Sequence, residues 1–426
     1  MRETEMGKAG ANPGCMPTAT EAAVGPASVA AADGAGGGQG VSRPRPIRVL
    51  HVLSRLDRGG AELATVELMR RSDPGRFRFD VCTLSGRAGG LAGQLGQLGV
   101  AVYPLAVRRL DFSSRFRRLL RSKRFDVVHC HVHHASGFIL RLAGQAGVPG
   151  RIAFFHNSHD GRPNNWLRRA YRAWMRRAIR RHATSVLAGS RATMASVWGR
   201  DWDQGPRFEV LYLGVEPPNG DCRDRQGVAD EFGLPATAPL YVHVGRMTEQ
   251  KNHFRLVSVI AALRKRQPAA RLLVVGAGEP EVERRVRSAI RRLGLDGAVV
   301  LCGERTDVFR LVASADVMIF PSLWEGQGLA ALEACAVGTP VVASDLPCLT
   351  EMAAYLDGIH CLGLDREDDQ WARLILRVAE QYKRPHKRRA AARRLLESPF
   401  HLQRAVEAAN RLWAEAARSQ WRGGDG

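Results

Sequence analysis

The sequence has no cysteine pair at the C-x-x-C spacing of zinc sites and redox motifs. Its eight cysteines are scattered, and several lie in apolar runs, where a thiol behaves as a small hydrophobic group. This pattern predicts free thiols in a reducing compartment and argues against a fold held together by disulfides.

Long apolar runs are lacking too. No stretch reaches the roughly 20 apolar residues that a membrane-spanning helix needs. The chain does not start with a basic segment followed by an apolar core, so we expect no secretory signal. We therefore expect a cytoplasmic protein, one that could still associate peripherally with the inner face of the plasma membrane.

Acidic residues are scarce relative to basic ones. The chain has 42 Asp and Glu against 63 Lys and Arg, which gives a formal net charge of +21. Such an excess favours anionic partners, namely nucleic acid, anionic lipid or phosphorylated small molecules, although an arginine-rich surface also arises from the base composition of the coding DNA. The sequence shows no helix-turn-helix, zinc-finger or aromatic RNA-binding signature, so we expect no specific nucleic-acid partner.

Composition and periodicity divide the chain into four parts. Residues 1–45 are rich in Ala, Gly and Pro and contain no aromatic residue, which predicts a disordered tail. Short apolar runs then alternate with amphipathic segments, and this pattern restarts after a Gly-, Asp- and Pro-rich loop at 216–238. We predict an α/β fold with two Rossmann-like, doubly wound domains, 46–218 and 219–399, that face each other across a cleft. The amphipathic helix within 400–426 is expected to pack back on the N-terminal domain.

Ligands of such sheets bind beyond the carboxyl ends of the strands, so the candidates are the residues that follow each predicted strand. In the first half, Gly59 and Gly60 follow the strand 47–54 and precede a helix. Paired glycines let the backbone approach a ligand, and helix-start amides attract anions. The alternative is an ordinary turn between a strand and a helix.

Histidines gather at two further strand ends of the first half. His129, His131 and His133 share one face of an extended segment. A triple-histidine metal site is one interpretation, but one strand rarely presents three ligands to one ion, and we expect no metal. The preferred interpretation is that His131 positions a ligand hydroxyl and that His156, at the next strand end, is a secondary or acceptor-side candidate. Both could also be structural histidines held by hydrogen bonds.

The second half places two cations in one short loop. Gly245, Arg246 and Lys251 lie at or just past the end of the strand 239–246. Two such cations suit a diphosphate, because Arg offers a bidentate fork and Lys a compact point charge. The alternative is a pair of solvated surface cations. Further along, Glu325 stands on a glycine turn and Glu333 inside an apolar helix pattern, a pair that first suggests an acid and a base.

Six motifs, taken in order, resemble family 4 of the glycosyltransferases: G-G-A-E, H-C-H, G-R-x4-K, V-V-G-A-G, E-G-Q-G-L-A-A-L-E and G-T-P-V-V-A-S. Members of that family have the GT-B fold, in which two Rossmann-like domains enclose the active site. The resemblance covers residues 47–418. The segments H-V-L-S-R-L-D-R-G-G-A-E, S-G-F-I-L-R-L-A-G-Q-A-G-V-P and G-R-M-T-E-Q-K-N-H are most similar to the branch that builds bacterial exopolysaccharides.

The resemblance implies a role for each matching position. Arg246 and Lys251 would hold the donor diphosphate. Glu333 would bind the ribose hydroxyls, Glu325 would contact hydroxyls of the donor sugar, and His131 would lie near the reacting carbon. Further donor contacts are implied for Gly59, Gly60, Gly245, Gly328, Leu329 and Ala330, with the amides of the last three capping the phosphates.

The implied reaction is a retaining transfer from a UDP- or GDP-sugar to a hydroxyl of a glycan or lipid-linked acceptor. Members of the family need no bound metal or other cofactor, and this sequence shows no D-x-D motif. Without a metal, fixed cations and helix-start amides must stabilise the charge that develops on the leaving group. In the mechanism proposed for such enzymes, the leaving diphosphate takes the acceptor proton on the same face of the sugar, so no enzymic nucleophile is required.

One departure from the family pattern concerns specificity. Gln327 stands where Phe is common, while Cys335 and Val337 replace residues that are more often Met and Cys. Because Gln327 lies next to the expected sugar pocket, it is an acceptor-side or secondary candidate at the position where the sugar preference could be set.

Two alternatives for the function and one further partner remain open. A nucleotide-sugar epimerase would use the same fold without an acceptor, and a protein that binds anionic polymers would account for the charge. The segments 108–124 and 166–182 mix Arg with aromatic and aliphatic residues in the expected acceptor domain. We expect them to dock on an anionic membrane that carries a lipid-linked acceptor. The competing interpretation is that their apolar residues face the core and their arginines are merely solvated.

Overall fold

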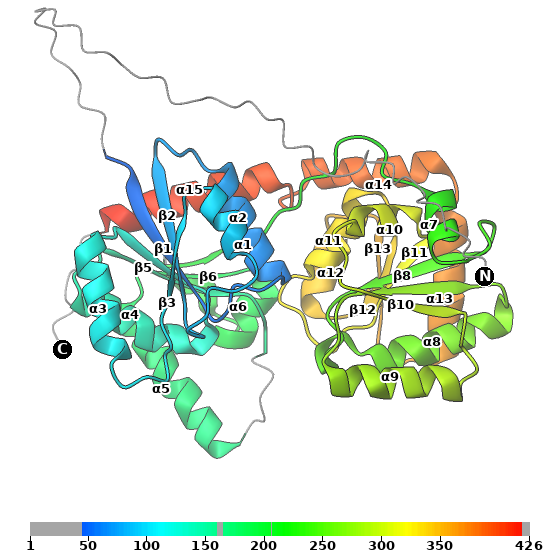
Figure 1. Cartoon of the computed structure of the whole chain (residues 1–426), viewed down its shortest axis with the longest axis horizontal. Helices are drawn as coiled ribbons and strands as arrows, with labels where there is room; N and C mark the ends of the chain where they lie inside the picture. The colour runs from blue at the N-terminus through cyan, green and yellow to red at the C-terminus, as the bar shows by residue number, and fades with distance from the viewer. Residues whose placement is uncertain (1–44, 160–164, 206, 420–426) are drawn as a thin grey trace, which may run out of the picture.

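The computed structural model describes residues 45–159, 165–205 and 207–419, and these form two α/β lobes (Figure 1). The predicted tail, apart from residue 45, lies outside the described residues. Among the helices of this described part, none is both long enough and apolar enough to cross a bilayer.

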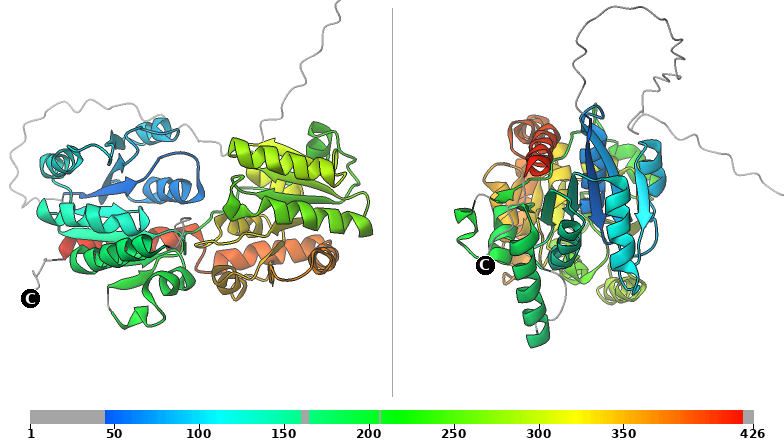
Figure 2. Two further views of the ribbon diagram at one scale, coloured as in Figure 1. Left: turned by 90° about the horizontal axis from the view of Figure 1, so that it is seen from below. Right: turned by 90° about the vertical axis from the view of Figure 1, so that its left-hand side faces the viewer.

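The first lobe is built on a parallel sheet with seven described strands, in the order β3-β2-β1-β4-β5-β6-β7. Its strands are β1 (Ile47–Leu53), β2 (Phe77–Thr83), β3 (Ala101–Pro104), β4 (Val127–Cys130), β5 (Gly150–Phe155), β6 (Ser185–Ala188) and β7 (Phe208–Val210). Its helices are α1 (Gly60–Arg71), α2 (Ala92–Gln97), α3 (Phe112–Lys123), α4 (Ser136–Gln145), α5 (Trp166–His182) and α6 (Arg191–Trp198), with 3-10 turns η1 (His133–Ala135) and η2 (Trp202–Gln204). Helices lie on both sides of the sheet (Figure 2), which is why every residue of the central strands β4 and β5 is buried.

The second lobe repeats this plan with six described strands, in the order β10-β9-β8-β11-β12-β13. The strands are β8 (Leu240–Val244), β9 (Arg271–Val275), β10 (Val299–Gly303), β11 (Val317–Phe320), β12 (Val341–Ser344) and β13 (Ile359–Leu362). The helices are α7 (Arg225–Glu231), α8 (His253–Arg266), α9 (Pro280–Arg292), α10 (Val308–Ser314), α11 (Leu329–Ala336), α12 (Pro347–Ala353), α13 (Asp368–Gln381) and α14 (Pro385–Glu397), with a 3-10 turn η3 (Glu249–Lys251). Both sheets start at a central strand and reverse their order there, so the predicted doubly wound architecture is confirmed.

The last helix, α15 (Leu402–Arg418), returns to the first lobe, where it lies in red beside the blue strands in Figure 1. It packs across β5, β1 and β4. Trp413 is fully buried there in a cluster that includes Phe77, Val127 and Phe154. The C-terminal helix therefore completes the core of the N-terminal lobe.

The structure corrects one predicted strand and adds elements that were not predicted. The apolar run 207–215 pairs with the sheet only over β7, because the chain then leaves the sheet and its backbone finds other partners. Leu213 bonds to Gln327, and Val215 pairs with His401. Between 345 and 399, where the sequence pattern had not been assigned, the chain forms α12, β13, α13 and α14.

The two lobes are joined by hydrogen bonds to the turn before α11. The hydroxyls of Ser190 and Thr193 both donate to the carbonyl oxygen of Gly326, at 2.6 and 2.8 Å. Ser190 also caps α6, because its oxygen accepts from the Thr193 amide. Ser158 donates to the carbonyl oxygen of Glu325 at 3.0 Å.

A carboxylate of the second lobe binds the start of the same helix. Glu351, on α12, accepts hydrogen bonds from the amides of Arg191 and Ala192 at 3.0 and 3.1 Å. It also accepts from the hydroxyl of Tyr212 at 2.6 Å. A negative charge is favourable at a helix N-terminus, where backbone N–H groups lack intrahelical partners. Glu351 therefore fixes α6 against α12.

Gly326 leaves no room for a side chain at this interface. A Cβ atom there would lie 1.6 Å from the carbonyl oxygen of His156, a backbone atom of the other lobe. We predict that Gly326→Ala separates the lobes, lowers the rate of sugar transfer by about 100-fold through misplacement of the site, and enlarges the molecule in small-angle scattering.

Gly93→Ala is the matched control, because a Cβ atom at Gly93, within α2, meets nothing within 4 Å. This variant should keep both the transfer rate and the scattering profile. Normal transfer by Gly326→Ala with unchanged scattering would show that the closed interface is not the working conformation.

Candidate active site

The carboxyl ends of the central strands of the first lobe meet the start of α11 in the second. A Cβ atom on Gly60, the first residue of α1, would lie 3.2 Å from the side chain of Leu329, the first residue of α11. The backbone after β5 abuts Gly326. The structure therefore brings Gly59, Gly60 and His156 from one lobe to the Glu325–Ala330 segment of the other.

Lys251 and Glu325 form a close ion pair in this region. Lys251 Nζ donates to Glu325 Oε1 at 2.6 Å, and the two side chains are 16% and 7% exposed. The ammonium group also lies 4.5 Å from the centre of the Phe320 ring. A Cβ atom on Gly245 would approach the Lys251 methylenes to 3.0 Å, so a glycine there lets the Lys251 chain pass. Such a pair is costly to break by removing one partner, because a buried charge is left uncompensated.

Glu333 lies one helix turn into α11, partly exposed. Burial raises the pKa of this carboxyl to about 7, and the nearby Lys251 acts in the opposite direction. α11 begins after Gly328, which has a left-handed φ of +88° and would press a Cβ atom to 2.7 Å from Leu349. Glycine relieves both constraints. The first amides of α11, which have no intrahelical acceptor, are thus held next to Lys251 and Glu325.

Arg246 is the exposed cation of the site. No ion pair involves its side chain within the residues that the structure describes. It lies close enough to Glu62, on α1 of the other lobe, to oppose the rise in the pKa of Glu62 that burial causes. Glu62 belongs to the G-G-A-E motif but was not among the predicted site residues. Gly276, with φ +138°, permits the loop after β9 to reach the Gly245 carbonyl.

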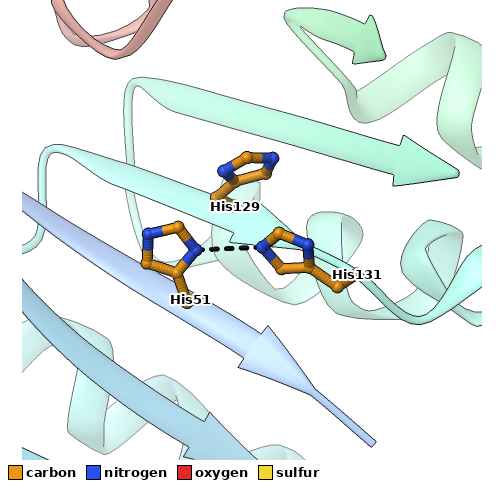
Figure 3. A group of neighbouring side chains, drawn as sticks. All are labelled: His51, His129 and His131. Atoms are coloured by element: carbon orange, nitrogen blue, oxygen red, sulfur yellow. Dashed lines mark hydrogen bonds between the residues drawn. The ribbon is translucent and has the colours of Figure 1, made fainter. Parts of the chain in front are cut away.

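The histidines form a hydrogen-bonded series that differs from the expectation. His51 Nδ1 lies 2.9 Å from His131 Nε2 (Figure 3), and His131 Nδ1 lies 2.7 Å from His156 Nε2. Both ring nitrogens of His131 are therefore engaged, and neither is available to a sugar hydroxyl in this arrangement. His51 was missed because it lies within β1 rather than at the strand end.

The side chains of His51, His129 and His131 also form a group that could hold a metal ion, with one candidate ligand atom from each within 4.8 Å of the others (Figure 3). Their bonding does not fit an ion well. The facing nitrogens of His51 and His131 already share a proton, and His129 Nδ1 accepts from the indole N–H of Trp413 at 3.1 Å. Among the described residues, this leaves Nε2 of His51 and Nε2 of His129 as the ring nitrogens of the group without a hydrogen-bond partner. His133 is not part of the group. It has a left-handed φ of 51° and approaches the Asn157 carbonyl at 3.2 Å.

Gln327 does not face a sugar pocket in this structure. It is 4% exposed. Its amide nitrogen donates to the Leu213 carbonyl at 2.6 Å, and its amide oxygen accepts from the Leu213 N–H at 2.8 Å. These bonds occupy the side chain fully across the lobe interface. In this structure Gln327 thus joins the lobes, and its influence on the choice of sugar stays a prediction.

Two family models match the chain. The model described as glycosyl transferases group 1 matches residues 224–395, and that described as glycosyl transferase 4-like domain matches residues 59–214. These ranges correspond to the second and first lobes.

Individual proteins agree with the family models. The chain is 30% identical over 342 residues to the putative glycosyltransferase EpsF of Bacillus subtilis. This alignment covers 78% of this chain and 88% of EpsF. It is 27% identical over 339 residues to the capsular polysaccharide biosynthesis glycosyltransferase CapH of Staphylococcus aureus, covering 79% of this chain and 92% of CapH. The fold is similar to that of Anabaena HepE in complex with UDP-glucose, with a TM-score of 0.71, 20% identity, and coverage of 88% of this chain and all of that one. The chain belongs to the group 1, family 4-like glycosyltransferases and has their two-lobed GT-B fold.

Proposed function

We propose that the enzyme transfers a sugar, with retention of anomeric configuration, from a UDP- or GDP-sugar to a hydroxyl of a glycan or lipid-linked acceptor in exopolysaccharide or cell-envelope glycan synthesis. The observation that carries the donor assignment is Lys251, held against Glu325 beside the start of α11. The names of EpsF and CapH support the pathway, and the UDP-glucose complex of HepE supports the donor class. Because the relatives are transferases, the epimerase alternative is not favoured.

We propose one orientation for the donor in this site. Its diphosphate would lie between Arg246, Lys251 and the amides of Gly328, Leu329 and Ala330, where cations and helix-start N–H groups converge. Glu333 would accept hydrogen bonds from the ribose hydroxyls, and Glu325 from hydroxyls of the sugar.

The chemistry then needs no enzymic nucleophile. The bond between the anomeric carbon and the diphosphate oxygen breaks, and the acceptor oxygen bonds to that carbon on the same face. The acceptor proton passes to the departing diphosphate. Arg246 and Lys251 stabilise the negative charge as it develops, which is the largest contribution in many reactions of this kind.

Lys251→Ala should lower the transfer rate by about 100-fold or more, because one fixed cation at the leaving group is lost. The measurement is product formation from a radiolabelled nucleotide sugar, with the melting temperature taken in parallel because Glu325 loses its partner. Lys265→Ala, on an exposed lysine of α8, is the matched control. A normal rate in a folded Lys251→Ala protein would remove the proposed site.

Donor binding should also depend on pH through Glu333. Since its pKa is raised to about 7 from an ordinary 4.5, the carboxyl is largely protonated at pH 6, and it must lose that proton before it accepts both ribose hydroxyls. Because the folded protein holds this proton more tightly than the unfolded chain does, the free energy of unfolding should fall as pH rises from 4.5 to 7. Calorimetry with UDP-glucose, whose diphosphate stays ionised, should show weaker binding at pH 6 than at pH 8. Glu333→Gln should abolish this pH dependence, and an equally steep dependence in that variant would refute the assignment.

The acceptor side offers a surface suited to an anionic membrane. In α3 the apolar residues Phe112, Phe116 and Leu120 are buried, as the competing interpretation expects, but Leu110 just before the helix is fully exposed. α5 differs, because Trp166 and Trp174 are 69% and 61% exposed. Exposed arginines lie on the same helix, among them Arg169, Arg177, Arg180 and Arg181. The N-terminal end of α5 extends away from the lobe (Figure 1). Exposed indoles combined with Arg suit the headgroup region of an anionic bilayer.

Vesicle flotation tests this surface. The wild-type protein should float with vesicles that contain phosphatidylglycerol and much less with neutral vesicles. The double variant Trp166→Ala/Trp174→Ala should lose most of this binding, whereas Leu293→Ala, an exposed apolar residue of the second lobe, should not. Equal flotation on both lipids would remove the membrane proposal.

A further inference from the structure

Three imidazoles form a chain that crosses the sheet of the first lobe, and we call His51, His131 and His156 the histidine chain. They come from β1 and from the ends of β4 and β5, which are neighbours in the sheet. Its two links are 2.9 and 2.7 Å long, and Figure 3 shows the first of them. One end, His51, is fully buried, and the other, His156, lies at the interface with the second lobe.

The protons of the histidine chain have only two possible arrangements. Burial lowers the pKa of His51 and of His156 to about 3 and that of His131 well below its usual value, so all three rings are neutral. A neutral imidazole carries one proton, on one of its two nitrogens. Each link uses one proton, and the third must sit at an end. It is either on Nδ1 of His156, at the interface, or on Nε2 of His51, in the core.

The core end disfavours the proton. His51 Nε2 is buried without a hydrogen-bond partner. Its ring packs against those of Phe79 and Trp413, with centroids 5.8 and 5.5 Å away. A proton on this nitrogen would be a buried donor without an acceptor, whereas a proton on Nδ1 of the partly exposed His156 can be bonded by water or by a ligand. The favoured arrangement therefore leaves His51 Nε2 bare and places a proton on Nδ1 of every ring in the histidine chain.

At the interface end, this arrangement turns His156 into a hydrogen-bond donor. Its ring is partly exposed, and its Nδ1 makes no hydrogen bond within the part of the chain that the structure describes. Its own carbonyl oxygen lies against Gly326, next to the start of α11. We propose that His51 and His131 are positioning residues that hold His156 as the Nδ1–H tautomer, so that His156 donates a hydrogen bond to an oxygen of the bound nucleotide sugar. The hydrogen bond to the nucleotide sugar rests on the proposed function, whereas the assignment of the tautomer does not.

A neighbouring histidine provides an internal contrast. The indole N–H of Trp413 can only donate, and it points at Nδ1 of His129 at 3.1 Å. His129 must therefore carry its proton on Nε2, although that nitrogen is also buried without a hydrogen-bond partner among the described residues, because the indole leaves Nδ1 only the role of acceptor. One sheet face should thus hold three Nδ1–H rings and one Nε2–H ring, and the C-terminal helix that carries Trp413 keeps His129 out of the histidine chain.

Nitrogen-15 NMR of the full-length, substrate-free protein with labelled histidine tests the proposal directly. At pH 7 we expect Nδ1–H signals for the histidine chain and an Nε2–H signal for His129, each assigned by single substitution. An Nε2–H tautomer or an imidazolium in any ring of the histidine chain would overturn the proposal. The proposal would also be overturned if each chain held one tightly bound metal ion and the His51→Asn variant lost it. Because the spectrum needs no substrate, its failure is distinct from failure of the proposed function.

Two substitutions at His51 then test the consequence for catalysis. The carboxylate of His51→Asp only accepts, so it reverses the histidine chain and leaves a bare nitrogen on His156 facing the donor. The amide of His51→Asn can still donate and keeps the original direction. We expect kcat to fall by about 10- to 100-fold in His51→Asp, with UDP affinity unchanged, and to stay within a few fold in His51→Asn.

Melting temperature and UDP binding report whether each variant is folded. Equal kcat values in two folded variants would show that the direction of the histidine chain does not matter for transfer. If His51→Asp does not fold, the spectrum of the wild-type protein still decides the tautomer.

Discussion

The hydrogen bonds between the turn at Glu325–Gly328 and the first lobe hold the rest of the site in place. The carbonyl oxygen of Gly326 accepts from two hydroxyls, those of Ser190 and Thr193, while Gln327 pairs with both backbone groups of Leu213. These bonds satisfy polar groups that are buried at the interface, where an unpaired group would be costly. As a result, the start of α11 has one position relative to the ends of β1 and β5.

That position gives Lys251 its central electrostatic role. Its ammonium group neutralises Glu325 and opposes the effect of burial on the pKa of Glu333, so two carboxylates of the site share one cation. Arg246 stays exposed at the same edge. An incoming diphosphate would therefore meet Arg246, which forms no ion pair within the described part of the chain, and Lys251, which must shift part of its interaction from Glu325. In this account Glu325 is a temporary partner that holds Lys251 in place until the donor arrives.

Much of this could be predicted from the sequence, for physical reasons. Alternation of apolar runs and amphipathic segments predicted two doubly wound sheets, and the rule that ligands bind at strand ends picked out Arg246, Lys251 and Glu325. Spacing along the chain does not say which way a loop side chain turns, so it did not predict that Gln327 bonds to Leu213 of the other lobe. His51 lies in the middle of a strand, where the sequence does not distinguish a hydrogen-bonded histidine from an ordinary core residue. Ser190 has the sequence context of a helix cap, and nothing in that context predicts its bond to Gly326 of the other lobe.

The central claim is that fixed protein groups, namely Arg246, Lys251 and the start of α11, bind the diphosphate of the donor. The most direct measurement is calorimetric binding of UDP and of UMP to the full-length protein in the presence of a chelator. UDP should bind at least about 10-fold more tightly than UMP, because the second phosphate gains charge-assisted hydrogen bonds. Equal affinities, or UDP binding that appears only when a divalent cation is added, would contradict the account.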